Sequence, residues 1–290
     1  MSDVDVIVLD LDGGPMLLEC LDSIARQTLQ PNRVIVFDNG SRAPTPGATA
    51  RSERNLGFAG GVNAAVRLAA SPFVALINND VVLDDDWLAT VRDAIDDPSP
   101  PAPLPAPRGE GSRLAREESP LPAHGERVAE GRVRGTAAVQ TIVRRDAATI
   151  DGAGIDISDG TIRQIGHGLP LSAPLAEAWG VSATAALYRR ELLRFDERFF
   201  AYYEDVELCA RLHDRGWRTR VVPTAKATHR GSQSASSVDA KRLRTRNRYF
   251  VARLHHGVGR IGALLREDAR LLLRGRASVR GMIEGLCSKL

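Results

Sequence analysis

The apolar residues of the first eighty positions predict strands that alternate with helices. Residues 4–9 (VDVIVL) form an apolar, β-branched run of strand length, and the acids and glycines of 10–14 follow it as a turn. The next elements are predicted as a helix at 16–24, a strand at 34–37, a helix at 63–70 and a strand at 73–77. This alternation predicts an α/β fold with a mainly parallel sheet flanked by helices. Such sheets bind ligands at the carboxyl ends of their strands.

The pattern changes after these elements. Residues 98–134 are rich in Pro, Gly and charge and have almost no apolar periodicity, which favours a flexible surface insertion; a Pro-rich docking peptide is the alternative. Strand and hairpin signals return at 136–171. The remaining predictions are a helix at 204–215, a short strand at 219–222 and basic helices beyond 241.

Charge divides the chain into two parts. Residues 241–290 carry thirteen Lys and Arg against three Asp and Glu, which leaves 26 against 33 for residues 1–240. We therefore predict one domain over 1–240 and a basic helical extension over 241–290, each with its own partners. The extension can form an apolar stripe from Ile261, Leu264, Leu265, Leu271, Leu272 and Leu273. It either packs on the acidic body or docks on an anionic membrane surface; a nucleic-acid partner is not expected.

Composition places the chain among ordinary globular proteins. Its 290 residues are 43% hydrophobic and 26% charged. The three cysteines are far apart, which argues against a disulfide framework or a zinc site and fits a reducing cytoplasm. The first residues lack the basic start of a secretory signal, and no window approaches the roughly 20 apolar residues of a membrane span. We expect a cytoplasmic protein, with peripheral attachment to the inner face of the membrane as an open alternative.

Polar residues follow two of the predicted strands. Asp38 ends the strand at 34–37, and the turn after it would leave its carboxylate free to accept a hydrogen bond from a nucleobase N–H. Asp-Asn-Gly is also a common turn. Asn78-Asn79-Asp80 ends the strand at 73–77 and offers a hard oxygen ligand of the kind that Mg²⁺ or Mn²⁺ shares with substrate phosphates. A simple strand-to-loop turn explains it equally well.

A glycine-rich loop lies between these two sites. Its candidate ligand contacts are Asn55, Gly57, Gly61 and Asn63, within NLGFAGGVN. Backbone N–H groups at the start of a helix can approach a phosphate or a sugar closely. The spacing matches neither a dinucleotide fingerprint nor a Walker loop, and a structural turn stays open.

The segment 195–208 (FDERFFAYYEDVEL) surrounds acids with aromatic rings and then begins a helix. Burial and mutual repulsion would raise the pKa of one acid of Glu204-Asp205 toward the value useful for a general base. Acids also favour a helix N-terminus for its dipole alone. His229 follows a predicted strand. A histidine at such a position is more often a surface residue, and the functional alternative is a metal ligand.

In this order, these segments resemble the family 2 glycosyltransferases, especially their bacterial rhamnosyltransferase-like branch. The resemblance rests on VIVFDNGS, NLGFAGGVNAA, ALINNDV, FDERFFAYYEDVELCARL and HRGS, and extends over residues 4 to about 250. It implies a GT-A fold, a nucleotide-sugar donor, direct displacement with inversion and a divalent ion, Mg²⁺ or Mn²⁺. Residues 98–134 depart from the family, where this connection is usually more regular, and put acceptor contacts on that side in doubt.

The resemblance also implies roles for single residues. Asp38 matches the base-contacting acid, and Asp10 is a further nucleotide contact. Asn78-Asn79-Asp80 stands where the family has Asp-x-Asp, so Asp80 matches the metal carboxylate, and Asn at the first position weakens the metal assignment. The remaining matches are Asp205 as the base that deprotonates the acceptor, Glu204 as the acid that orients it, Asn79 as a nucleotide contact and His229 as a second metal ligand.

The expected function is transfer of one sugar from a nucleotide donor to a hydroxyl of a saccharide or lipid-linked saccharide in cell-envelope glycan synthesis. The branch favours dTDP-L-rhamnose over a UDP-sugar. Three alternatives are weighed against it: glycosylation of a soluble secondary metabolite, nucleotidyl transfer, and a catalytically inactive sugar-nucleotide-binding protein. Nucleotidyl transfer is disfavoured because residues 9–16 (LDLDGGPM) lack Lys and Arg, and loss of activity is disfavoured because acids are present at all the candidate sites.

Overall fold

A computed structural model of the chain describes residues 2–97, 134–231, 238–255 and 258–287. The predicted insertion at 98–134 lies outside these ranges except for Arg134. The helices are α1 (Pro15–Ala25), α2 (Gly57–Val66), α3 (Trp87–Asp96), α4 (Glu204–Asp214), α5 (Val238–Leu254), α6 (Ile261–Leu273) and α7 (Val279–Cys287), with 3-10 turns η1 (Arg190–Leu192) and η2 (Glu197–Phe199). The strands are β1 (Val4–Asp10), β2 (Arg33–Asp38), β3 (Ala50–Arg51), β4 (Phe73–Asn78), β5 (Val81–Leu83), β6 (Thr136–Arg144), β7 (Ile150–Gly152), β8 (Ile155–Asp156), β9 (Arg163–Gln164), β10 (Ala185–Arg189) and β11 (Arg218–His229).

One nine-stranded sheet organises the described residues. Its order is β3-β2-β1-β4-β10-β6-β11-β5, with β7 paired to β6, while β8 and β9 form a separate two-stranded sheet. The α/β class is confirmed, but the sheet is mixed rather than mainly parallel. The β3-β2-β1-β4 part is parallel, whereas β10 runs antiparallel to both β4 and β6. Parallel neighbours need a crossover, which α1 and α2 provide; no helix separates β6 from β10 in the described chain, so these strands pair antiparallel.

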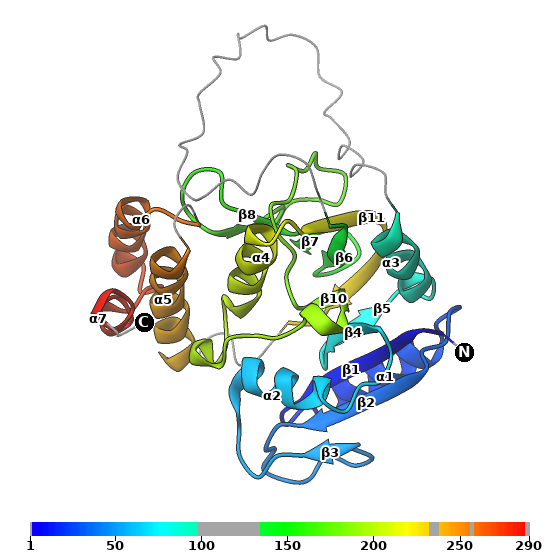
Figure 1. Cartoon of the computed structure of the whole chain (residues 1–290). Coiled ribbons are helices and arrows are strands. Elements are labelled where there is room, and N and C mark those ends of the chain that lie inside the picture. Colours follow the sequence, from blue (N-terminus) through cyan, green and yellow to red (C-terminus); the bar gives the residue numbers. More distant parts are fainter. Residues whose placement is uncertain (1, 98–133, 232–237, 256–257, 288–290) are drawn as a thin grey trace, which may run out of the picture.

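Helices cover both faces of this sheet (Figure 1). Val6 and Val8 of β1 pack with α1 and α3 in one buried cluster, and Ile7 packs with α2 and α4 in another. The two clusters follow from the alternation of side chains along a strand, which makes the VDVIVL run apolar on both faces. The carboxyl ends of β1, β2 and β4 therefore come together at one edge between the two helical layers.

The extension begins with a helix that belongs to the body of the protein. The proposed boundary between residues 240 and 241 falls inside α5. Phe250 and Val251 of α5 are buried with Phe199 and with Val206 of α4. In Figure 1, α5, α6 and α7 lie together beside α4, on the side away from α3.

The predicted apolar stripe of the extension is divided between the interior and the surface. Leu264 is fully buried against Tyr249 and Ala252 of α5, because the α6 face that carries it turns toward the core. Leu273 of α6 is 90% exposed, and Val279 and Ile283 of α7 are each 58% exposed. The other exposed large apolar residues of these helices are Ile261 and Leu265.

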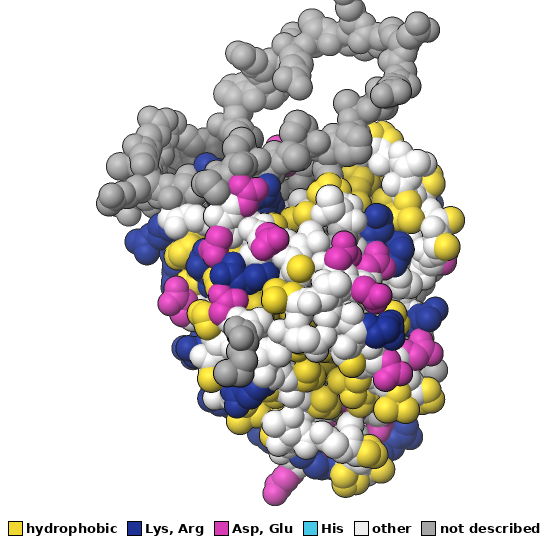
Figure 2. Space-filling model, turned by 90° about the vertical axis from the view of Figure 1, so that its right-hand side faces the viewer, with side chains coloured by type: hydrophobic (Ala, Val, Ile, Leu, Met, Phe, Trp, Pro, Cys, Tyr) yellow, Lys and Arg dark blue, Asp and Glu magenta, His cyan; other side chains and the backbone are white. Residues whose placement is uncertain are grey.

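The side of the molecule that carries α3 and the N-terminus has a surface of mixed charge. Figure 2 shows acidic and basic side chains interspersed there, without a broad area of one sign in this view. A search of the described helices found none with the length and apolarity that crossing a membrane requires.

Candidate active site

The first group of site residues lies at the carboxyl ends of β1, β2 and β4. Asp10 and Asp38 end adjacent parallel strands and are partners in their register. Asp10 is buried; its Oδ1 accepts a hydrogen bond from Asn79 Nδ2 at 2.7 Å, and its Oδ2 accepts one from Thr45 Oγ1 at 2.6 Å. The structure thus brings together three predicted nucleotide contacts, Asp10, Asp38 and Asn79, from segments far apart in the sequence.

The carboxylate of Asp38 holds the loop that follows it. Its Oδ1 accepts from Ser41 N at 2.8 Å, and its Oδ2 accepts from Thr45 N at 3.0 Å and Arg51 Nη1 at 2.5 Å. Burial opposes ionisation, but these backbone hydrogen bonds and the Arg51 charge outweigh it and lower the pKa of Asp38. The side chain has no exposed surface, so a nucleobase would have to displace one of these partners to reach it.

The predicted glycine-rich loop is helical from Gly57 onward, as the start of α2, and its glycines allow close packing. Gly57 has φ +74°, and a Cβ atom there would lie 2.4 Å from the carbonyl oxygen of Phe200. At Gly61 it would lie 2.7 Å from Leu9 and 2.9 Å from Asn39. These contacts favour the structural interpretation of both glycines, which let α2 approach β1 and the Phe200 loop. Asn55 Oδ1 accepts a hydrogen bond from Gly57 N at 2.8 Å and shapes the same turn.

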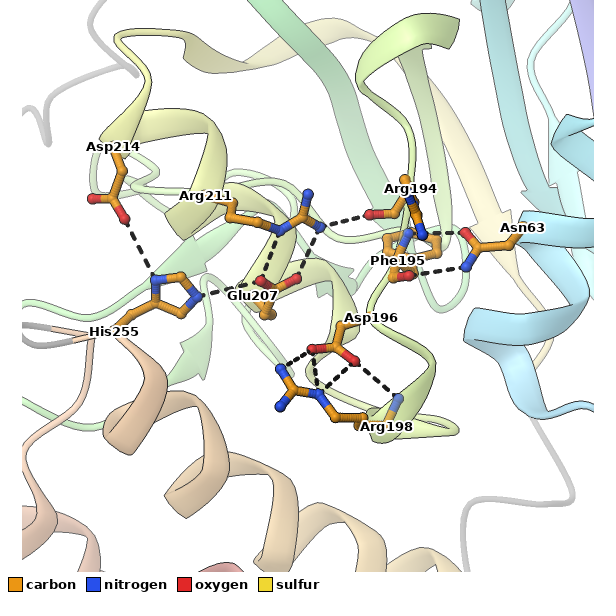
Figure 3. A network of polar contacts seen from close by, with 9 residues as sticks. All are labelled: Asn63, Arg194, Phe195, Asp196, Arg198, Glu207, Arg211, Asp214 and His255. Carbon is orange, nitrogen blue, oxygen red and sulfur yellow. Dashed lines mark hydrogen bonds and ion pairs between the residues drawn. The ribbon is translucent and has the colours of Figure 1, made fainter. Parts of the chain in front are cut away.

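Asn63 points toward the segment before α4. Its Nδ2 donates to Phe195 O at 2.9 Å and Glu197 Oε1 at 3.0 Å, and its Oδ1 accepts from Phe195 N at 2.9 Å. Figure 3 shows the two hydrogen bonds between the Asn63 side chain and the backbone of Phe195. The amide of Asn63 is thereby engaged by the protein, and in this arrangement it joins α2 to the acid-rich segment.

A second group of site residues surrounds His229 at the end of β11. His229 Nε2 lies 3.1 Å from Asp80 Oδ2, and Nδ1 lies 2.8 Å from Asp151 Oδ2. Burial opposes protonation, but the two carboxylates outweigh it and raise the pKa of His229 to about 9. β11 pairs with β5, which follows Asp80 directly, so the sheet itself brings Asp80 and His229 together.

The donor set around Asp80 fits a divalent cation shared with a diphosphate. Within the described part of the chain, Asp80 Oδ1 is buried and has no hydrogen-bond partner. Asp151 on Nδ1 would orient the ring of His229 so that Nε2 faces the cation, as carboxylates do beside metal-binding histidines. Among the described residues, no cluster of three or more His, Cys, Asp or Glu is arranged for a metal. Two protein ligands plus phosphate oxygens are nevertheless a common arrangement for Mg²⁺.

The third group lies at the N-terminus of α4. Three residues just before it have a positive φ although they are not glycine: Phe200 at +64°, Tyr202 at +71° and Tyr203 at +70°. Each such conformation costs on the order of 1–3 kcal/mol and persists where the surroundings impose it. Glu204 and Asp205 follow at once, so their side-chain directions depend on this backbone.

The two acids differ in their surroundings. Asp205 is partly exposed and accepts from Val206 N at 2.8 Å and Ala183 N at 3.2 Å. Glu204 is buried, and its Oε2 has no partner among the described residues. Burial and the neighbouring charge of Asp205 raise the pKa of Glu204 to about 8, and burial also raises that of Asp205. A proton held by this pair is available for exchange near neutral pH.

This raised pKa predicts a pH-dependent stability. Because Glu204 holds its proton more tightly in the folded than in the unfolded chain, its contribution to stability is complete below its ordinary pKa of 4.5 and is lost as the pH rises toward about 8. We expect Glu204→Gln to have a higher melting temperature than the wild type at pH 8 and nearly the same one at pH 4.5. Thermal unfolding of both proteins over a pH series measures this difference in melting temperature.

Glu191→Gln is the matched control, because Glu191 is exposed. It should leave the melting temperature close to that of the wild type at every pH. A Glu204→Gln protein that is equally stable, or less stable, at pH 8 would contradict the burial of an ionisable carboxyl at this position.

A polar network fixes α4 behind these acids (Figure 3). Glu207 is buried and accepts from Arg211 Nε at 2.7 Å and Nη2 at 2.9 Å. His255, at the end of α5, lies with Nε2 3.3 Å from Glu207 and Nδ1 3.5 Å from Asp214. The network ties α4 to the extension.

Sequence reasoning missed three residues of this region. Asn39 donates to Gly57 O at 2.9 Å and accepts from Leu56 N at 3.1 Å, so it fastens the glycine-rich loop to β2. Asp151 and Asn247 also escaped notice. Asn39 was visible only as the centre of a turn, and the partners of the other two lie far away in the sequence.

The α/β sheet with helices on both faces and acids at the carboxyl ends of its parallel strands has the architecture of a GT-A glycosyltransferase, which its solved structural neighbours share. Residues 6–194 match glycosyl transferase family 2, and the chain belongs to that family. N-acetylglucosaminyl-diphospho-decaprenol L-rhamnosyltransferase of Mycobacterium tuberculosis is 27% identical to it over 309 residues, which cover 98% of this chain and 95% of the relative.

Solved structures show the same fold. The mannosyltransferase PcManGT of Pyrobaculum calidifontis, in complex with GDP-Man and Mn²⁺, matches with a TM-score of 0.55 and 18% identity over 93% of this chain and 70% of that one. GalNAc-T7 with UDP, GalNAc and Mn²⁺ matches with a TM-score of 0.54 and 12% identity over 94% of this chain and 57% of that one.

Proposed function

We propose that this glycosyltransferase moves a sugar, with inversion, from a nucleotide donor to a hydroxyl of a lipid-linked saccharide in cell-envelope glycan synthesis. dTDP-L-rhamnose is the favoured donor, ahead of a UDP-sugar. The near full-length similarity to a rhamnosyltransferase whose name specifies a GlcNAc-diphospho-prenol supports both substrates. The observation that carries the chemistry is the acid pair Glu204-Asp205, buried or partly buried with a raised pKa at the start of α4.

In this mechanism, the nucleotide lies over the carboxyl ends of β1, β2 and β4. Asp10, Asn79 and the loop held by Asp38 shape the surface for the base and ribose. Asp80 and His229 would hold Mg²⁺ or Mn²⁺, which neutralises charge on the departing diphosphate. Asp151 orients His229.

Asp205 performs the proton transfer. One of its carboxylate oxygens accepts the proton of the acceptor hydroxyl as that oxygen attacks the anomeric carbon, and the nucleoside diphosphate leaves from the opposite face. The bond between the anomeric carbon and the diphosphate oxygen breaks, and the configuration inverts. Glu204 lies beside Asp205, and burial raises the pKa of Asp205 toward the range that suits a general base.

The test is transfer from a panel of nucleotide sugars to a short-chain GlcNAc-diphospho-prenol, with Mn²⁺ and with a chelator. The proposal expects transfer from dTDP-L-rhamnose that the chelator abolishes. Transfer only to soluble aglycones would favour the secondary-metabolite alternative. Tight nucleotide binding without any transfer or donor hydrolysis would favour an inactive binding protein.

The basic extension is proposed to dock on the inner face of an anionic membrane, where such an acceptor would be found by a cytoplasmic enzyme. The exposed apolar side chains of α6 and α7 have exposed arginines as neighbours: Arg266, Arg270, Arg274, Arg276 and Arg280. Each basic residue near an anionic surface contributes about 1 kcal/mol. We expect the protein to sediment with anionic vesicles at low salt, and high salt to release it.

Leu273→Glu should weaken this sedimentation, because Leu273 is the most exposed apolar residue of α6. Leu18→Glu is the matched control, since Leu18 is an exposed leucine of α1 in the opposite part of the molecule. Equal binding to neutral and anionic vesicles, or an equal effect of both substitutions, would indicate that the extension has only a structural role.

A further inference from the structure

Asn247 is an amide with no exposed surface in the middle of α5. Its Nδ2 lies within hydrogen-bond distance of three carbonyl oxygens: Phe199 O at 2.9 Å, Ala201 O at 2.8 Å and Tyr202 O at 2.7 Å. The segment 199–203 is thus drawn onto one side chain from a helix more than forty positions away. This segment contains the left-handed residues that precede the acid pair.

The neighbouring side chain fixes the direction of this amide. Arg246 Nε donates to Asn247 Oδ1 at 2.7 Å, so the oxygen faces the guanidinium and the NH₂ group faces the carbonyls. Arg246 Nη2 also donates to Arg198 O and Phe199 O, both at 2.9 Å. Two adjacent residues of α5 therefore supply donors to four successive or nearly successive carbonyls before α4.

The opposite side of the same segment is held by α2. Ala59 N donates to Phe200 O at 3.1 Å, and the absence of a side chain at Gly57 lets Phe200 approach. Tyr203, the last residue before α4, gives no side-chain cap to the helix. The direction in which Glu204 and Asp205 leave the loop is consequently set by contacts from α2 and α5.

We infer that Asn247 is a positioning residue for the catalytic acids: by binding the carbonyls of Phe199, Ala201 and Tyr202, it holds the left-handed backbone that aims Glu204 and Asp205 at the acceptor. The side-chain amide of Asn247 donates to backbone carbonyls of the loop, so its effect on the acids passes through the loop. The inference rests on the proposed function for the identity of the acids. The inference makes α5 part of the catalytic domain. This assignment does not depend on the surface that α6 and α7 bind.

Asn247→Asp is the sharpest probe, because it keeps the shape and the oxygen that faces Arg246 but replaces the donor by an acceptor opposite three carbonyls. Asn247→Leu removes the donor without adding charge and serves if the Asp variant fails to fold. Thr245→Val is the matched control: Thr245 is buried in the same helix, but its hydroxyl contacts Lys241 O and Ser278 N instead of the loop.

We expect the Asn247 variants to lose about 100-fold in kcat, the effect of misplacing a catalytic group by about 1 Å. The Kd for dTDP or UDP with Mn²⁺ should stay at the wild-type value, because the nucleotide surface belongs to β1, β2 and β4. Thr245→Val should keep the wild-type kcat. A wild-type kcat in a folded Asn247 variant, or an equal loss in Thr245→Val, overturns the inference.

Amide hydrogen exchange separates this inference from the proposed function. Exchange at 200–205 should quicken in the Asn247 variants and stay unchanged in Thr245→Val, while that of 208–214 within α4 is preserved in all. If the wild type transfers no sugar, the proposed function fails, and exchange alone then decides whether Asn247 holds the loop. Unchanged exchange at 200–205 overturns it.

Discussion

Asp205→Asn is expected to lower kcat by about 10²–10⁴-fold and to leave nucleotide binding nearly intact. Asparagine preserves the size of the side chain but cannot take the proton of the acceptor hydroxyl. The proposed donor surface lies at the carboxyl ends of β1, β2 and β4, so the Kd for the nucleoside diphosphate should not change. Single-turnover transfer and calorimetric titration with dTDP and Mn²⁺ measure the two quantities.

Asp93→Asn provides the control for this substitution, because it makes the same chemical change at an exposed position of α3. Its kcat should equal that of the wild type. If Asp205→Asn kept near-wild-type turnover while Glu204→Gln lost it, the roles within the pair would be reversed. If neither substitution lowered turnover, the acid pair would not contain the base.

Asp80→Ala should weaken Mn²⁺-dependent binding of the nucleoside diphosphate as well as turnover. Neutralisation of the leaving group by a cation is worth several kcal/mol, which corresponds to a factor of about 10² or more in rate. Removing the carboxylate also leaves His229 with Asp151 as its remaining acidic partner among the described residues. Nucleotide titrations with Mn²⁺ and with a chelator, beside steady-state kinetics, separate the two losses.

Asp85→Ala is the companion variant, because Asp85 lies a few residues further along and is exposed. It should match the wild type in both assays. The assignment of Asp80 fails if its Ala variant binds the nucleotide with unchanged affinity and unchanged dependence on Mn²⁺.

The fold class and several element positions could be predicted locally, but α3 and β10 were not predicted, and the helix expected at 63–70 is α2 at Gly57–Val66. The helix expected at 204–215 is α4 at Glu204–Asp214, because acids at its start and apolar residues at helical spacing act within the segment itself. The strand expected at 219–222 instead continues to His229 as β11, since its second half pairs with β5 and β6. Pairing between distant strands leaves little trace in a short window of sequence.

The candidate site divides in the same way. Asp38 and Asp80 could be found because each ends a recognisable strand, and Glu204-Asp205 because family motifs surround them; their roles stay predictions. The glycine-rich loop could not be interpreted locally. A glycine that lets a phosphate approach and one that lets Phe200 approach have the same spacing, and only the packed structure distinguishes them.

By itself, the sequence indicated the alternation of strands and helices in the first eighty residues, helix α4, the family and the acids placed at strand and helix ends, because each is encoded by periodicity or by a short motif. The tertiary structure alone decided that Asp151 orients His229 across 78 positions and that Asn247 collects the carbonyls before the acid pair. It also decided that Leu264 is buried while Leu273 is exposed. These outcomes depend on contacts between segments that are far apart in the sequence. The local sequence around a residue does not specify such contacts.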